Sequence, residues 1–181
     1  MTATPSVERT KSLQVSPAPD GSFTFTTRLT DRSWRGHYEH GDNSALIHDF
    51  TVIGAVGADL VVTRLEVDAV EHPYDLCPAI LPACGLLVGA SLGTGWRKAV
   101  LGNMAGRRGC THVTTLLLGL TEVSTMVFFL RINERLRFGP AARADGSWMA
   151  AGYDLVPSLD GACHVLQGRR PPSAAGAESA S

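Results

Sequence analysis

The chain has 181 residues, a formal net charge of -1 and nearly balanced numbers of acidic and basic side chains. That length fits a single domain, and the apolar residues, 44% of the chain, can fill a core. A dedicated nucleic-acid-binding protein would present a basic face. The basic residues here gather only in short pairs, so we expect no nucleic-acid partner.

The two ends of the chain differ in composition from its middle. Residues 1–21 are rich in proline, serine and threonine, which is typical of disorder, and residues 169–181 have the same character. We therefore predict one folded domain over residues 22–168. The first residues lack the apolar core of a secretory signal, so we expect a cytoplasmic protein whose four cysteines are thiols or ligands. Polar residues interrupt the apolar region 116–130, which predicts a buried helix and not a membrane span.

The first half of the folded region has the alternating, β-branched pattern of strands. Residues 22–30 and 34–40 predict two strands. Residues 45–56 and 59–70 predict a hairpin. A change of phase between Val62 and Leu65 predicts either a β-bulge or a strand that is covered on both faces. A strand exposed at a sheet edge, such as residues 22–30, can pair with a second copy of the chain, so a homodimer is an open expectation.

From Cys77 onward the pattern becomes helical. A helix is expected to begin near Pro78, because proline is tolerated in a first turn, and a second, shorter helix is expected to end at Gly106. Apolar residues over 113–130 follow helical spacing and predict a central helix. Strands followed by helices predict an α+β fold, with an antiparallel sheet in the N-terminal half packed on helices in the C-terminal half. Cys84 and Trp96 are expected in its core.

Thiol, imidazole and carboxylate groups occur at four places near the ends of predicted elements, where side chains can converge. They are His48 with Asp49, Cys77, Cys110 with His112, and Cys163 with His164. Zinc and iron accept such ligands. Each residue alone also has an ordinary structural explanation, since a free cysteine is often buried in a core. The four places together favour a functional site.

Cys110 lies directly before the predicted central helix, with His112 two residues further on. The positive end of that helix favours a thiolate, which is the form that binds metals or attacks as a nucleophile. The same helix amides can bind an anionic substrate group. The turn decides whether both side chains face one point, so a metal-binding role and a nucleophilic role stay open.

Four motifs resemble those of an uncharacterised bacterial domain-of-unknown-function family. They are IHDF, the segment from CPAI through LLVG to GTGW, RGCTHVTTLL, and LDGACH. The resemblance covers residues 46–166 and implies a shared fold and a shared polar site. A glutamate is usual in that family where this chain has Thr115, so the resemblance also implies an activity that is lost or altered here.

A more distant resemblance is to iron–sulphur scaffold proteins of the NifU type, with a NifU- or SufE-like layout of the fold. It rests on the order and spacing of His48 with Asp49, Cys77 and Cys110. A histidine in place of the scaffold's first cysteine favours a single metal ion over a cluster.

These observations predict a small-molecule enzyme of bacterial specialised metabolism, a lyase, isomerase or cyclase acting on a carbonyl-bearing, polyketide-like or acyl substrate. Zinc or non-haem iron would polarise the carbonyl, and no nucleotide cofactor is expected because GTGW is too short for a nucleotide fingerprint. The candidate metal ligands are His48, Cys77, Cys110, His112 and Cys163, and the candidate catalytic residues are Asp49, Cys110 and His112. Two alternatives stay open: a metal-free cyclase with an apolar pocket, and a scaffold that carries metal or iron–sulphur cargo.

Overall fold

The computed structural model describes residues 6–34, 44–137 and 139–166. The chain divides into two compact units, Met1–Ser124 and Thr125–Ser181. The folded region predicted over residues 22–168 includes parts of both units, and its being a single domain stays a prediction. The tail predicted to be disordered, residues 169–181, lies outside the described residues.

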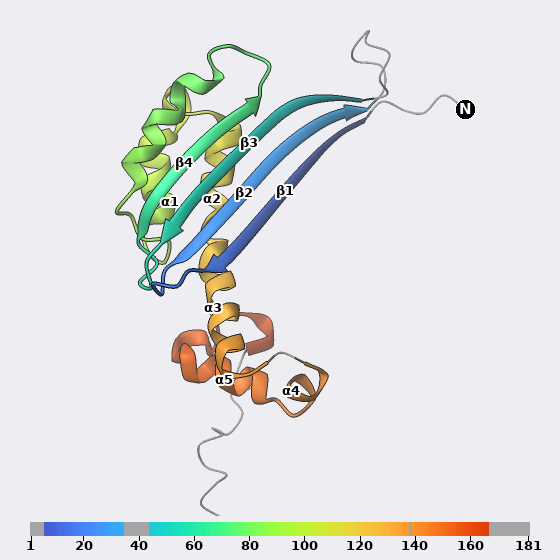
Figure 1. Ribbon diagram of the computed structural model, residues 1–181, viewed down its shortest axis with the longest axis vertical. Helices are drawn as coiled ribbons and strands as arrows, with labels where there is room; N and C mark the ends of the chain where they lie inside the picture. The colour runs from blue at the N-terminus through green and yellow to red at the C-terminus, as the bar shows by residue number, and fades with distance from the viewer. Residues whose placement is uncertain (1–5, 35–43, 138, 167–181) are drawn as a thin grey trace, which may run out of the picture. The chain divides into compact units, whose positions relative to one another are not determined.

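The described residues of the first unit form a four-stranded antiparallel sheet in the order β1-β2-β3-β4 (Figure 1). The strands are β1 Ser6–Pro17, β2 Phe23–Trp34, β3 Ser44–Val56 and β4 Val62–Glu71. The predicted α+β fold, with its sheet in the N-terminal half and helices in the C-terminal half, is confirmed.

The predicted hairpin of β3 and β4 and its bulge are both present. Val62 pairs with Val56 and Arg64 pairs with Ala55, which leaves Thr63 as the extra residue on β4. The Thr63 hydroxyl donates a hydrogen bond to the Ala55 carbonyl across this irregularity. The bulge absorbs the change of phase that the sequence shows between Val62 and Leu65.

Strand β1 is the main departure from the sequence-based expectation. Residues 6–17 pair with β2 along their whole length, although their composition predicts disorder. Because β1 takes the edge of the sheet, residues 22–30 belong to β2 and have a neighbouring strand on each side. They are therefore not the exposed edge expected to pair in a homodimer. The strand expected over residues 34–40 lies outside the described residues except for Trp34, which ends β2.

The sheet leads into the helices of the first unit. They are η1 Cys77–Leu87, α1 Trp96–Met104, η2 Gly106–Arg108 and α2 Thr111–Gly119. Figure 1 shows α1 and α2 on the same face of the sheet, with α2 contacting β2 and β3 and η1 contacting β4. The helix predicted near Pro78 is present in 3-10 form, and the helix predicted to end at Gly106 is α1.

The predicted central helix is divided in two. After α2 the chain turns at Leu120 and Thr121 and continues as α3 Glu122–Arg135, which crosses the boundary between the units. The second unit adds α4 Pro140–Ala144, α5 Ser147–Leu155, η3 Pro157–Leu159 and η4 His164–Leu166.

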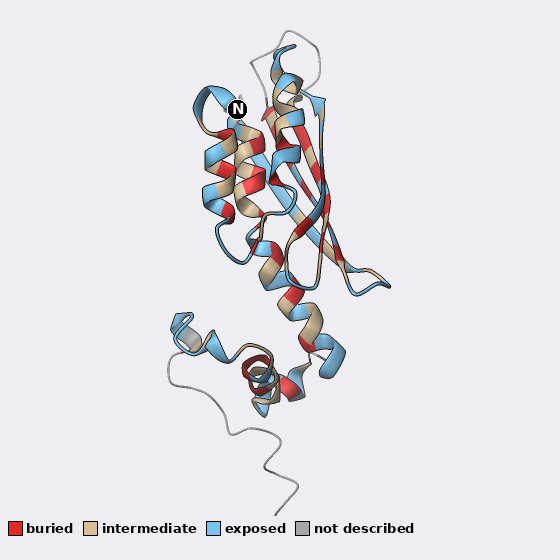
Figure 2. Cartoon of the chain, turned by 90° about the vertical axis from the view of Figure 1, so that its left-hand side faces the viewer, coloured by how far each residue is buried: buried red, intermediate tan, exposed pale blue. Residues whose placement is uncertain are grey.

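The core of the first unit lies between the sheet and its helices (Figure 2). Alternate residues of β2 and β3 are buried on one face, among them Leu29 and Phe50. Val113, Leu116 and Leu117 are the buried residues of α2. Each such side chain contributes about 1.5–3 kcal/mol on burial, so this packing fixes α2 on the sheet. We call the sheet face that α2 covers the inner face.

Cys84 and Trp96 are buried in this core, as predicted. The indole N–H of Trp96 donates a hydrogen bond to the carbonyl of Leu117 and ties α1 to α2. Burial raises the pKa of the Cys84 thiol to about 11, so this cysteine is a small core residue rather than a reactive thiol.

The stretch Thr111–Arg135, of 25 residues, has the length and apolar composition of a membrane span. A core helix passes the same test, so this feature is weak evidence for a membrane. The first part of the stretch, α2, buries three of its apolar side chains in the core of the first unit. Its packing accounts for the apolar character that the sequence shows there.

Candidate functional site

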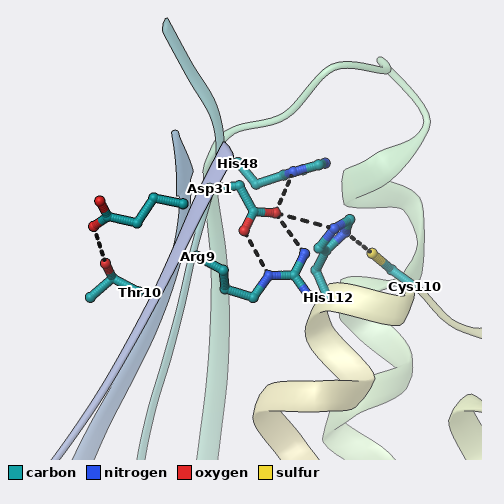
Figure 3. Close-up of polar contacts among 7 residues, drawn as sticks. Arg9, Thr10, Asp31, His48, Cys110 and His112 are labelled. Atoms are coloured by element: carbon teal, nitrogen blue, oxygen red, sulfur yellow. Dashed lines mark hydrogen bonds and ion pairs between the residues drawn. The ribbon is translucent and has the colours of Figure 1, made fainter. Parts of the chain in front are cut away.

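Polar side chains gather on the inner face of the sheet beside the start of α2 (Figure 3). We call them the inner-face cluster: Arg9, Asp31, His48, Cys110 and His112. They come from three adjacent strands, from α2 and from the residue directly before α2, so the cluster exists only in the folded protein. All five belong to the first unit.

The register of the sheet aligns three of these residues. Arg9 of β1 is the pairing partner of Asp31 of β2, and Asp31 is in turn the partner of His48 of β3. The pairing then shifts, because Arg32 pairs with Leu46 and Ile47 becomes an extra residue on β3. Bulges of this kind are common beside active sites, where they re-aim a side chain.

Asp31 is the centre of the cluster and is only 5% exposed. Arg9 donates to both carboxylate oxygens, from Nε to Oδ1 and from Nη2 to Oδ2, at 2.7 Å each. His48 Nδ1 lies 2.9 Å from Oδ2. The hydrogen bond from Arg9 holds the pKa of the Asp31 carboxyl below its usual range, against the opposing effect of burial, and His48 adds to the same lowering. Asp31 is therefore an ionised carboxylate at neutral pH.

The ring of His112 lies beside the rings of His48 and Phe50. Its centroid lies 3.8 Å from that of His48, and it is nearly parallel to the ring of Phe50, with centroids 5.8 Å apart. Burial lowers the pKa of His112, and electrostatic interactions with His48 and Arg9 lower it further, with Asp31 opposing them. His112 is therefore neutral at pH 7 and keeps a lone pair on one ring nitrogen.

The two nitrogens of His112 face different partners. Nε2 lies 3.5 Å from Oδ2 of Asp31, and Nδ1 lies 3.6 Å from the sulphur of Cys110. Cys110 is the residue before α2, and its carbonyl accepts the first helical hydrogen bond, from the Thr114 N–H. The folded turn therefore brings the side chains of Cys110 and His112 together. The sequence alone leaves this point open.

Three groups in the cluster could hold a metal ion. One ligand atom each from Asp31, His48 and His112 lies within 4.8 Å of the others. A tetrahedral zinc ion with bonds of about 2.0–2.1 Å separates its ligand atoms by about 3.3 Å. The distances from Asp31 Oδ2 to His48 Nδ1 and to His112 Nε2, 2.9 and 3.5 Å, bracket that value.

The other candidate residues lie elsewhere. The Asp49 carboxylate is buried and paired with Arg28, and because strand side chains alternate, it lies on the opposite face of β3 from His48. Cys77 begins η1 and is half-buried. Among the described residues, Cys77 is not part of the group of side chains that could share a metal ion. Cys163 is exposed in the second unit.

Asp31 and Arg9 were not predicted from the sequence. The strand pattern predicted there ended at Thr30, and residues up to 21 were expected to be disordered. A signal for Asp31 was available, because it continues the buried alternation of Phe25 and Leu29 along β2. A carboxylate in such a position requires a partner. Arg9 offers no comparable local signal, since only strand pairing brings it opposite Asp31.

Comparisons with known proteins bear on the family and not on the chemistry. A search of curated proteins and a search of solved structures each gave no match. The resemblance to iron–sulphur scaffold proteins therefore stays a prediction. The profile of one family, described as "Protein of unknown function (DUF2889)", matches residues 7–126. This range spans most of the first unit and every residue of the inner-face cluster. The chain belongs to the DUF2889 family.

Proposed function

We propose that the protein is a metal-assisted enzyme that acts on a carbonyl-bearing small molecule, with its metal ion held by Asp31, His48 and His112. The observation that carries this proposal is the convergence of these three ligand atoms from two strands and a helix. Two histidines and one carboxylate make up catalytic zinc sites, which keep a fourth position open, and also the facial triad of non-haem iron enzymes.

The protonation states of the cluster suit a metal. His112 is kept neutral and Asp31 is kept ionised, which are the forms that ligate. His48 shares Oδ2 of Asp31 through its Nδ1. For Nδ1 to bind a cation there, it must present its lone pair, so the ring proton of a neutral His48 would lie on Nε2. Arg9 would keep its two hydrogen bonds to Asp31 and hold the carboxylate in place.

The reaction that this centre supports is carbonyl activation. A bound zinc or iron ion acts as a Lewis acid on a carbonyl oxygen. Lyase, isomerase and cyclase reactions of acyl or polyketide-like substrates proceed from such an activated carbonyl. A role in bacterial specialised metabolism is part of this proposal.

The first experiment measures metal content and affinity. Protein made without a histidine tag is analysed for metals, stripped with a chelator, and titrated with Zn²⁺ and Fe²⁺ in competition with a chromophoric chelator. One ion per chain is expected. Asp31→Asn and His48→Ala should weaken binding by more than the 10–100-fold typical of a lost outer partner. His72→Ala is the matched control, because His72 bonds to the Tyr74 carbonyl outside the cluster and its loss should leave affinity unchanged.

The second experiment addresses turnover. The stripped and the metal-loaded protein are incubated with β-keto acids and β-ketoacyl thioesters, and products are followed by mass spectrometry. Turnover should appear with metal and disappear with Asp31→Asn. Full activity of the metal-free protein, or a wild-type chain that binds no ion, would refute the metal-assisted function.

A further inference from the structure

Cys110 belongs to the inner-face cluster but is not one of the three ligands of the proposed metal centre. The sulphur lies 3.6 Å from Nδ1 of His112, and the other nitrogen, Nε2, faces Asp31 at 3.5 Å. Figure 3 shows the thiol and the carboxylate reaching the imidazole from different sides. In the described part of the chain, the sulphur does not cap α2 by a hydrogen bond. Its polar neighbour is the imidazole.

We infer that Cys110 is a positioning residue that accepts a hydrogen bond from Nδ1–H of His112 and thereby turns the Nε2 lone pair toward the metal ion. A neutral imidazole carries one proton, so a proton fixed on Nδ1 leaves Nε2 free to ligate. Metal-binding histidines almost always donate their second N–H to an outer partner. This inference rests on the proposed function, because it assigns an outer partner to one ligand of that centre.

The geometry argues against Cys110 as a fourth ligand. The two nitrogens of an imidazole point to different sides of the ring. A sulphur on the Nδ1 side therefore lies more than about 5 Å from a metal ion on Nε2, whereas a zinc–sulphur bond is about 2.3 Å. To bind the metal ion, the sulphur of Cys110 would have to move from the Nδ1 side of the imidazole to its Nε2 side.

The backbone around Cys110 is held in place. The Cys110 carbonyl accepts the hydrogen bond from Thr114 N–H at 2.8 Å, and the Thr114 hydroxyl donates to the Met104 carbonyl at 3.2 Å. Gly109 packs so closely on that carbonyl that a Cβ would lie 2.0 Å from its oxygen. The sulphur is thus presented to His112 by a turn that α1 and α2 both anchor.

The cluster then has a consistent outer layer. Arg9 holds the carboxylate of Asp31 through two hydrogen bonds, and Cys110 holds the imidazole of His112 through one. Arg9 comes from β1, the strand next to the one that supplies Asp31, and Cys110 is the residue directly before α2, which supplies His112. Loss of such partners typically costs 10–100-fold in metal affinity.

The test compares zinc affinity in four proteins: the wild type, Cys110→Ala, Cys110→Ser and the control Cys77→Ala. We expect Cys110→Ala to bind Zn²⁺ 10–100-fold more weakly, since Nδ1 loses its acceptor. Cys110→Ser keeps an acceptor oxygen and should recover part of that loss. Cys77→Ala should match the wild type. Circular dichroism and thermal unfolding of each variant confirm that the fold persists.

A spectroscopic measurement separates positioning from ligation. Wild-type protein loaded with Co²⁺ should lack the near-ultraviolet charge-transfer band that a thiolate ligand produces. A band that is present in the wild type and absent in Cys110→Ala would make Cys110 a ligand and overturn the inference. Equal zinc affinities of the wild type and Cys110→Ala would overturn the inference as well. If Cys110→Ala then also loses turnover, Cys110 acts as a nucleophile and not as a positioning residue.

These outcomes differ from a failure of the proposed function. A wild-type chain that binds neither Zn²⁺ nor Co²⁺ refutes the metal centre and the inference together. Binding that Asp31→Asn abolishes and Cys110→Ala leaves intact refutes the inference alone.

Discussion

Two buried carboxylates of neighbouring strands differ in what surrounds them. Asp31 lies on the inner face, where Arg9 and His48 both reach it. Asp49 lies on the other face, where Arg28 donates to both of its oxygens. A carboxylate that is held by one arginine is a structural ion pair. A carboxylate that also faces two imidazoles has the means to bind a cation.

The pair of Arg28 and Asp49 should therefore contribute to stability without affecting metal binding. Asp49 is 2% exposed, so Arg28→Met leaves a buried carboxylate without its donors. At neutral pH this should lower the free energy of unfolding, as measured by urea denaturation. Zinc affinity should not change. A variant as stable as the wild type would show that solvent replaces the arginine at no cost.

The same pair sets a pH dependence. The hydrogen bond from Arg28 lowers the pKa of Asp49 in the folded protein, whereas an unfolded aspartate titrates near 3.9. The stabilisation is therefore present above about pH 4 and is lost as pH falls through the folded pKa. The stability difference between the wild type and Arg28→Met should shrink in that acidic range. A difference that stays constant below pH 4 would contradict this assignment.

At the scale of elements, the connection of α1 and α2 sets the position of Cys110 and His112. A Cβ on Gly109 would meet the Met104 carbonyl oxygen at 2.0 Å, and backbone cannot move aside as a flexible side chain can. Gly109→Ala should therefore displace the turn, lower the free energy of unfolding by about 1–3 kcal/mol and weaken zinc binding. Thermal unfolding and chelator competition measure the two effects.

Gly102 of α1 provides the matched control. The residue is inside a helix, and apart from its chain neighbours and the backbone of that helix, no described atom lies within 4 Å of a Cβ built there. Gly102→Ala should raise stability by about 0.5–1 kcal/mol and leave zinc affinity unchanged. If Gly109→Ala binds zinc as the wild type does, the turn does not position the cluster.

Helices and strands were predictable from the sequence where the local pattern of apolar and polar residues determines them. The hairpin of β3 and β4, its bulge at Thr63 and the burial of Trp96 all follow from side-chain phase and composition. Strand β1 was not predictable in this way. Apart from Val7, its first residues are charged or polar, and they are exposed. Their composition therefore predicts disorder, and the strand forms because β2 offers a pairing edge.

The same limit applies to the cluster. The sequence predicts His48, Cys110 and His112 as candidates because their imidazole and thiol groups lie near the ends of predicted elements, where side chains can converge. Asp31 and Arg9 became visible only when the register placed both on one line with His48. Pairing between strands is a long-range property, and no window of sequence around residue 9 contains it.

At the scale of the whole molecule, the proposed chemistry belongs to one of the two units. The family match ends at residue 126, close to the boundary after Ser124. Every residue of the inner-face cluster precedes that boundary. Of the candidate ligands, only Cys163 belongs to the second unit. A metal centre made of Asp31, His48 and His112 therefore requires nothing that follows α3.

A chain that ends after Arg135 tests this division, because it keeps the first unit and the whole of α3. It should bind zinc with the affinity of the full chain, measured by the same chelator competition, and Cys163→Ala in the full chain should have no effect. Near-ultraviolet circular dichroism checks that the shortened chain keeps its packed core around Trp96. A shortened chain that is folded but has lost zinc binding would mean that the second unit supplies a ligand. In that case Cys163→Ala would show the same loss, and the three residues of the inner face would be an incomplete site.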